Sequence, residues 1–269
     1  TLVKSSAASD VYKRQPDMGR AYQELGHLCK AIGENEEAAS HYRQACELNP
    51  ALVASWKSLF NYFNKRNNKA AAEHAHEQIK KLDSLPPILL YISQILNEGR
   101  LAIAEQKCRE FLKKNPTNVY AMSLLSDIAK KFGYYDDAEI LLENAVKFSP
   151  DDGEIRMKYA LILRLKQKFT ETMEQVNILC EKFPDNLSYQ AQKASEIMQN
   201  GYHSEAIDLF EKIIKQNPYN FSAMTSKGHA EKTLGKTDKA IESYKSAYKI
   251  KNDHGEAYFS LSNLKTYKF

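Results

Sequence analysis

The polar and apolar positions near the start of the chain alternate with the period of a helix. Tyr22, Leu25 and Cys29 are separated by three and then four positions, so they lie on one face of a helix. Gly33 follows at a point where a left-handed residue commonly ends a helix. Gly26 has no Cβ, so a second helix could approach this first one closely. The pattern predicts a helix that ends near residue 33 and packs against the next segment.

The next segment carries a second apolar stripe. Ala38, Tyr42 and Ala45 are spaced to form the inner face of another helix. Asn49 and Pro50 should end it, because proline cannot extend a helix and disfavours the helical conformation in the residue before it. The two segments therefore predict one helix–turn–helix unit.

The unit repeats along the chain, because a small residue keeps returning to the same place in the second helix. The spacings are 34, 32, 34, 68 and 34, and Thr172 fills the gap in the middle of the 68. A period near 34 residues is typical of an array of helix–turn–helix repeats. We therefore predict an all-α fold in which each repeat buries its apolar face against its neighbours. The recurring residues are Ala38, Ala72, Ala104, Ala138, Ala206 and Ala240.

In this frame, residues 16–269 closely resemble the tetratricopeptide repeat family. The first repeat carries the pattern most fully, from Tyr22-x-x-Leu25-Gly26 to Ala45 and Pro50. The resemblance implies an α-solenoid that coils into a right-handed superhelix, with the first helix of each repeat lining a concave groove. The predicted repeats span residues 19–52, 53–84, 85–118, 119–152, 153–186, 187–220 and 221–254, with a partial eighth at 255–269.

Two repeats depart from the pattern. The fifth has Ala160 and Gln167 in place of the glycines and Thr172 in place of the alanine, so we expect it to pack more loosely. The second has no closing Asn-Pro pair, and two residues are missing before Pro86. We therefore expect the junction between the second and third repeats to be tighter or kinked.

The first fifteen residues stand apart from the array. The run from Ser5 to Gln15 resembles the translation of an adapter used in transposase-based sequencing libraries. We expect residues 1–15 to be an artefact of read assembly and the chain to be cut at both ends. Removing the charged residues of this segment lowers the net charge from +4 to +2. This gives no general electrostatic reason to bind nucleic acid or an anionic membrane.

The sequence shows no signature of catalysis, so we predict no catalytic residue, metal ligand or cofactor. The glycine-rich phosphate-binding motifs are absent. His74 and His76 are two positions apart, so they lie on different faces of a helix and cannot form a metal pair. The four cysteines include no C-x-x-C pair and fall at packing positions, which fits a reducing cytoplasm. No run of 18 apolar residues could span a membrane.

The expected binding site is the concave groove that the family resemblance implies. Its ends are polar and its middle is more apolar, which suits an extended peptide or an amphipathic helix as the ligand. The alternative is that the apolar residues only pack against a neighbouring helix. The candidate binding residues are Lys57, Asn61, Lys65, Leu89, Tyr120, Asp127, Met157, Leu161, Arg164, His229, Phe259 and Asn263.

One ligand of the family does not match these residues. Some tetratricopeptide domains hold the acidic C-terminal tail of heat-shock chaperones with Lys and Asn followed by Asn, Lys and Arg. Lys57 and Asn61 fit the first two places, but Ser93, Tyr120 and Leu124 occupy the others. We do not predict this ligand.

Two functions remain open. The first is a protein–protein interaction scaffold without catalysis of its own. The second is the substrate-recruiting region of a larger enzyme, because residues 255–266 resemble the last repeat of bacterial tetratricopeptide–sulfotransferase proteins. In that family a following domain uses 3′-phosphoadenosine-5′-phosphosulfate as donor, and its phosphosulfate loop is absent from this chain. A role in secretion or glycosylation has no residue in its favour.

Overall fold

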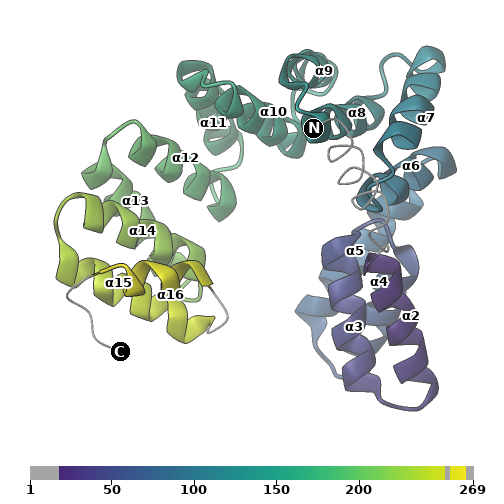
Figure 1. The fold of residues 1–269 in the computed structure, drawn as a ribbon, viewed down its shortest axis with the longest axis horizontal. Helices are drawn as coiled ribbons and strands as arrows, with labels where there is room; N and C mark the ends of the chain where they lie inside the picture. Colours follow the sequence, from purple (N-terminus) through teal and green to yellow (C-terminus); the bar gives the residue numbers. More distant parts are fainter. Residues whose placement is uncertain (1–17, 252–254, 265–269) are drawn as a thin grey trace, which may run out of the picture. The chain divides into compact units, whose positions relative to one another are not determined.

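The computed structural model describes residues 18–251 and 255–264, and within these ranges all regular structure is helical (Figure 1). Most of the helices form successive pairs. The first helices of the pairs are α2 (Met18–Ala31), α4 (Val53–Lys65), α6 (Pro87–Asn97), α8 (Val119–Phe132), α10 (Gly153–Leu165), α12 (Leu187–Gln199) and α14 (Phe221–Thr233). The second helices are α3 (Asn35–Leu48), α5 (Lys69–Asp83), α7 (Leu101–Lys114), α9 (Tyr135–Phe148), α11 (Phe169–Lys182), α13 (His203–Gln216) and α15 (Thr237–Ile250), and α16 (Gly255–Ser262) follows.

The two helices of each pair pack against each other, and the recurring small residue lies in the packed face of the second helix. The six alanines of the repeat frame and Thr172 are all 3% exposed or less. Such burial is expected where two helices approach closely and a larger side chain would separate them. The predicted all-α solenoid of helix–turn–helix repeats is therefore confirmed.

The turn between the two helices of a pair uses one residue with positive φ. Five of the pairs have glycine there: Gly33, Gly99, Gly133, Gly201 and Gly235. The second and fifth pairs have Asn67 with φ of 55° and Gln167 with φ of 59° instead. The turn therefore keeps its shape in the fifth repeat although it lacks the glycine.

The chain divides into two compact units, which are described separately. The first unit ends at Phe148 and contains α2–α9, and the second begins at Ser149 and contains α10–α16. In the first unit, one core cluster joins α6, α7 and α8, and another joins α3, α4 and α5. In the second unit, a cluster around Phe210 joins α12 and α13 to the start of α14, and a smaller one joins α15 to α16.

In the first unit, α6 contacts the loop that joins α3 to α4. Gln94 Nε2 donates to the carbonyl oxygen of Ala51 at 3.1 Å, and Asn49 Nδ2 donates to the carbonyl oxygen of Gln94 at 3.3 Å. Just after α6, Glu98 accepts a hydrogen bond from Arg20 Nε of α2 at 2.8 Å. The third helix pair therefore contacts the first pair directly.

The expectations for the segment before residue 18 and for the last residues of the chain fall outside the described residues. These are the assembly artefact at residues 1–15 and the unfinished end at Thr266–Phe269.

Candidate functional site

The polar end of the predicted groove lies on α4 in the first unit. Lys57, Asn61 and Lys65 are four positions apart and exposed, so they form one polar stripe along the helix. Lys57 Nζ is 3.3 Å from Asp83 Oδ2, and both side chains are about half exposed. An exposed ion pair of this kind adds little to stability, so exchanging it for a contact with a ligand costs little.

The prediction that Leu89 lines the groove is wrong. Its side chain is 1% exposed and belongs to the core that α6 forms with α7 and α8. α6 is apolar on nearly all faces, so its sequence pattern does not show which residues face the core. On α8, Tyr120 and Asp127 are half-buried, and Tyr120 packs against the same core.

The apolar part of the predicted groove lies on α10 in the second unit. Met157 and Leu161 are half-buried, and Leu165, one turn further on, is 49% exposed. The three residues are spaced by four positions and form a continuous apolar row on the helix.

Arg164 has a structural partner. Its Nη1 donates to Glu196 Oε1 of α12 at 3.1 Å, and the Glu196 side chain is only 3% exposed. Removing the guanidinium would leave a buried carboxylate without its cation, which is strongly destabilising. Arg164 therefore holds two helix pairs together, whatever it does toward a ligand.

The last candidates are His229 on α14, Phe259 on α16 and Asn263, which directly follows α16. His229 Nδ1 is 2.9 Å from the hydroxyl of Tyr244, and His229 Nε2 is 3.2 Å from Glu256 Oε1. Phe259 is 65% exposed and Asn263 is exposed, four positions further on. His229 is therefore held by Tyr244 of its own repeat and by Glu256 of the following helix, while Phe259 and Asn263 have surface open to a partner.

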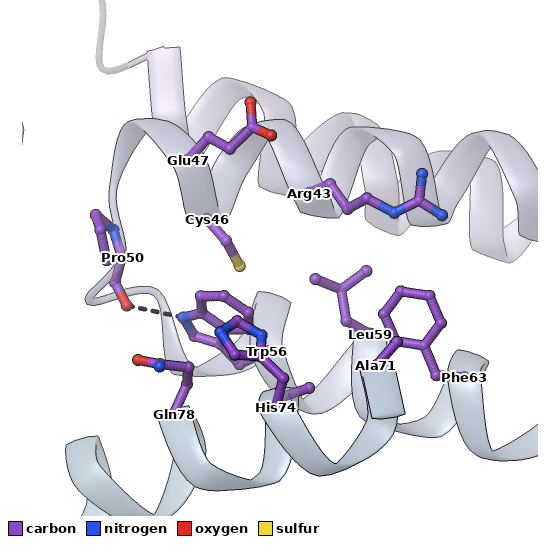
Figure 2. A pocket seen from close by; sticks show the side chains of 11 residues that line it. Arg43, Cys46, Glu47, Pro50, Trp56, Leu59, Phe63, Ala71, His74 and Gln78 are labelled. Atoms are coloured by element: carbon purple, nitrogen blue, oxygen red, sulfur yellow. Dashed lines mark hydrogen bonds between the residues drawn. The ribbon is translucent and has the colours of Figure 1, made fainter. Parts of the chain in front are cut away.

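A hollow that the sequence pattern did not indicate lies between α3, α4 and α5. It has a volume of about 510 Å³, which is within the range of binding sites for small ligands or single side chains. Figure 2 shows Trp56 of α4 between the side chains of α3 and α5, with its Nε1 donating to the carbonyl oxygen of Pro50 at 2.8 Å. On the α5 side the lining includes the short side chains of Ala71 and Ala75. These two small residues, one turn apart, are the only sign of the hollow in the sequence.

One group of three metal-ligating side chains lies close together in the described part of the chain. Cys29 on α2 and Glu37 and His41 on α3 offer ligand atoms that are all within 4.8 Å of one another. The sequence prediction of no metal ligand considered histidine pairs along one helix. The carboxylate of Glu37 four positions before His41 is the signal that could have pointed to this group.

The thiol pKa values of the four cysteines are all raised. Burial is the main cause that raises the pKa of all four cysteines, to about 12 for Cys46 and Cys108. A catalytic cysteine instead has a lowered pKa that makes it a thiolate near neutral pH. Among the described helices, none is long and apolar enough to cross a membrane.

Comparison with known proteins bears directly on two of the repeats. The family model described as tetratricopeptide repeat matches residues 19–52 and 221–254, which are the first and last complete repeats of the frame. Solved structures share the fold at low sequence identity. A tetratricopeptide repeat protein from Parabacteroides merdae has a TM-score of 0.54 at 14% identity and covers 91% of this chain and 98% of its own. MamA has a TM-score of 0.53 at 19% identity over 61% of this chain and 96% of its own.

A third structure, YrrB, is described as a tetratricopeptide protein with an unusual peptide-binding site. Its TM-score is 0.50 at 15% identity, and it covers 82% of this chain and 98% of its own. These likenesses establish the fold of the chain.

Two curated relatives are transferases. The human protein O-mannosyl-transferase TMTC1 is 22% identical over 184 residues, which is 65% of this chain and 21% of the relative. The probable UDP-N-acetylglucosamine–peptide N-acetylglucosaminyltransferase SPINDLY of Arabidopsis thaliana is 30% identical over 95 residues, which is 35% of this chain and 10% of the relative. The chain therefore spans between a tenth and about a fifth of the length of these relatives.

Proposed function

We propose that the chain is a protein-interaction scaffold that binds a peptide or an amphipathic helix on the first helices of its repeats. The apolar row on α10 carries this proposal. Met157, Leu161 and Leu165 form a strip just over two turns long that is partly open to solvent. Such a strip suits the anchors of a helix or the alternate side chains of an extended peptide. The tetratricopeptide fold and the peptide-binding site described for YrrB support this function.

The charges of the α4 stripe favour an acidic segment in the ligand. Lys57 and Lys65 present two ammonium groups beside the amide of Asn61. Exposed cations of this kind raise the association rate of an acidic partner more than its final affinity. We therefore propose that the α4 stripe of the first unit contacts acidic residues by itself, independently of the apolar anchors on α10 of the second unit.

The test is to select binding peptides from a displayed library with the purified chain and to measure their affinity by fluorescence anisotropy. Leu161→Lys places a charge in the middle of the α10 row and should weaken the selected peptides at least tenfold. Ile140→Lys is the matched control, because Ile140 is 57% exposed on α9, a second helix of a pair. Arg164 is left unchanged, since its loss would destabilise the chain through Glu196.

Two results would contradict this assignment. One is equal affinity of the selected peptides for Leu161→Lys and the unaltered chain. The other is an equal loss in Leu161→Lys and Ile140→Lys. Trp56 is the only tryptophan of the chain, so its emission also reports whether a peptide enters the hollow between α3 and α5 instead.

A second candidate function is recruitment of substrates for a larger transferase. The two transferase relatives, of which the chain spans only a small part, favour this idea. Sulfotransferase chemistry with a phosphosulfate donor rests only on the resemblance of residues 255–266. Sequencing the coding region beyond the codon of Phe269 tests both the recruitment role and the sulfotransferase chemistry. A following catalytic domain supports recruitment, its family decides the chemistry, and a stop codon at that point removes the idea.

A further inference from the structure

The cluster of Cys29, Glu37 and His41 joins the two helices of the first pair. Cys29 lies near the C-terminal end of α2, and Glu37 and His41 lie one turn apart on α3. His41 Nε2 is 3.9 Å from Glu37 Oε1, and all three ligand atoms are within 4.8 Å of one another. A thiol, a carboxylate and an imidazole therefore converge from two helices.

The fold itself brings positions 29 and 41 together. The family model matches residues 19–52 and 221–254 as the same repeat, so Cys29 and His41 correspond to Glu231 and Ser243. In that last complete repeat, Ser243 Oγ donates to Glu231 Oε2 at 2.7 Å. The two positions are thus in contact distance in both repeats, and in the first repeat they carry two metal-ligating groups.

The imidazole of His41 has no hydrogen bond to give up on binding a cation. Its Nδ1 is buried and has no partner, and its Nε2 is too far from Glu37 for a hydrogen bond. The ring is held in place by Tyr22, which stacks on it at a centroid distance of 5.9 Å. Glu37 is 61% exposed, so its carboxylate can change rotamer at little cost. The site therefore combines one fixed ligand with one adaptable ligand.

We propose that Cys29, Glu37 and His41 bind a zinc ion, with water or a partner's side chain in the fourth position. A sulfur, a nitrogen and an oxygen ligand suit zinc, whereas magnesium and calcium prefer oxygen alone. Zinc–ligand bonds of about 2.0–2.3 Å in a tetrahedron place the ligand atoms roughly 3.6 Å apart. The distances between the three ligand atoms would shorten to that value if Glu37 changed rotamer and the side chains of Cys29 and His41 moved slightly. On binding, the Cys29 thiol releases its proton to solvent and the thiolate forms the bond to zinc.

The carboxylate charge near the thiol agrees with a cation site. Desolvation, followed by the charges of Glu37 and Glu34, raises the pKa of the Cys29 thiol. The same negative potential attracts a divalent ion, which would reverse the effect on the thiol. Because the ion would join α2 to α3, zinc should raise the unfolding temperature of the chain.

The experiment uses the full chain, free of any histidine tag, reduced and stripped of metal with a chelator. Titration with cobalt(II) should give the thiolate-to-cobalt charge-transfer band in the near ultraviolet, and zinc should abolish it by displacement. Cys29→Ser should lose this band. Glu37→Gln and His41→Gln should each weaken zinc at least tenfold, since even groups that only support a ligand cost about 10–100-fold. Cys180→Ser, which alters another half-buried thiol, should bind like the unaltered chain.

A second measurement needs no variant and applies even if a substitution disturbs folding. Zinc should protect one cysteine from alkylation in the unaltered chain, and peptide mass spectrometry should identify it as Cys29. The proposal is overturned if no charge-transfer band forms, if the band survives in Cys29→Ser, or if zinc leaves the alkylation of Cys29 unchanged.

Discussion

The close approach of α2 and α3 can be tested at Gly26. A Cβ built there would lie 2.7 Å from Tyr42 Cε1 and 2.8 Å from Tyr42 Cδ1, which is closer than packed carbon atoms come. The ring has little room to retreat, because Tyr42 is 2% exposed and its hydroxyl is 2.8 Å from His27 Nδ1. Gly26→Ala should therefore strain this packed contact.

Two opposing effects set the change in the free energy of unfolding that Gly26→Ala should cause. Overpacking a tight core costs about 1–3 kcal/mol, and contacts this short place the cost in the upper part of that range. Replacing glycine by alanine inside a helix recovers about 1 kcal/mol. We expect Gly26→Ala to destabilise the chain by about 1–2 kcal/mol. In a Tyr42→Leu background the obstructing ring is gone, so the same change should stabilise by up to about 1 kcal/mol.

The assay is urea unfolding followed by circular dichroism, combined with hydrogen exchange of the amides in α2 and α3. The exchange data are needed because an array of repeats does not have to unfold in one step. The double-mutant cycle isolates the contact between the two residues, since the separate cost of Tyr42→Leu cancels. Gly228 provides a second copy of the test, with Tyr244 Cε1 at 2.6 Å from a built Cβ. The reasoning is refuted if Gly26→Ala has the same effect in both backgrounds.

The remaining predictions concern two turns, a helix cap and two titratable groups. Gln167→Gly should raise the free energy of unfolding by about 0.5–1 kcal/mol. A residue other than glycine in the left-handed conformation costs about 1–2 kcal/mol, which the substitution removes. Part of this gain is offset because glycine has more conformational freedom to lose when the chain folds. Asn67→Gly should gain less, since asparagine tolerates this conformation; an equal gain in urea unfolding would contradict the argument. Asn118→Ala should cost about 1 kcal/mol in thermal unfolding and Asn118→Ser should restore it, because the Asn118 side chain accepts from the amide of Ala121 at 2.9 Å. Burial raises the pKa of Tyr244 from 10.0 to about 12, so the unfolded chain ionises first and stability should fall as pH rises from 10 to 12. A pH titration of unfolding should show a smaller loss in Tyr244→Phe than in the unaltered chain; part of the loss should remain, because burial also raises the pKa of Tyr42 and Tyr189. Cys108 is fully buried with a pKa of about 12, so a disulfide reagent at pH 8 should label it only after unfolding.

The repeat frame could be predicted because it depends on positions within one helix–turn–helix unit. A helix crossing needs a small residue, which is why the alanine series predicted the buried faces. The turn between the helices needs a left-handed residue, which is why Gly33 was predictable. Gln167 could not be predicted in this way, because the same turn forms there with a residue for which the left-handed conformation is unfavourable.

The candidate site was predicted less well, because its geometry depends on the register between helices. α6 has apolar residues on all sides, so its pattern could not show that Leu89 faces α7 and α8. The pairing of Arg164 with Glu196 joins residues 32 positions apart on two first helices. The group of Cys29, Glu37 and His41 likewise appears only when α2 lies against α3. The spacing of Glu37 and His41 within α3 points to two of these ligands, but periodicity within one helix does not show which residue of another helix they meet.

The hydrogen bonds around α6 have a consequence for how the first unit loses its structure. In a solenoid, each repeat contacts only its neighbours, so a terminal repeat can open without disturbing the third. Here Arg20 bonds to Glu98 and Asn49 bonds to Gln94, so the first pair is tied to the third across the second. Opening of α2 breaks a bond that also holds the end of α6. The first three pairs should therefore behave as one cooperative block, in which the exchange of amides in α2 and α6 slows or quickens together.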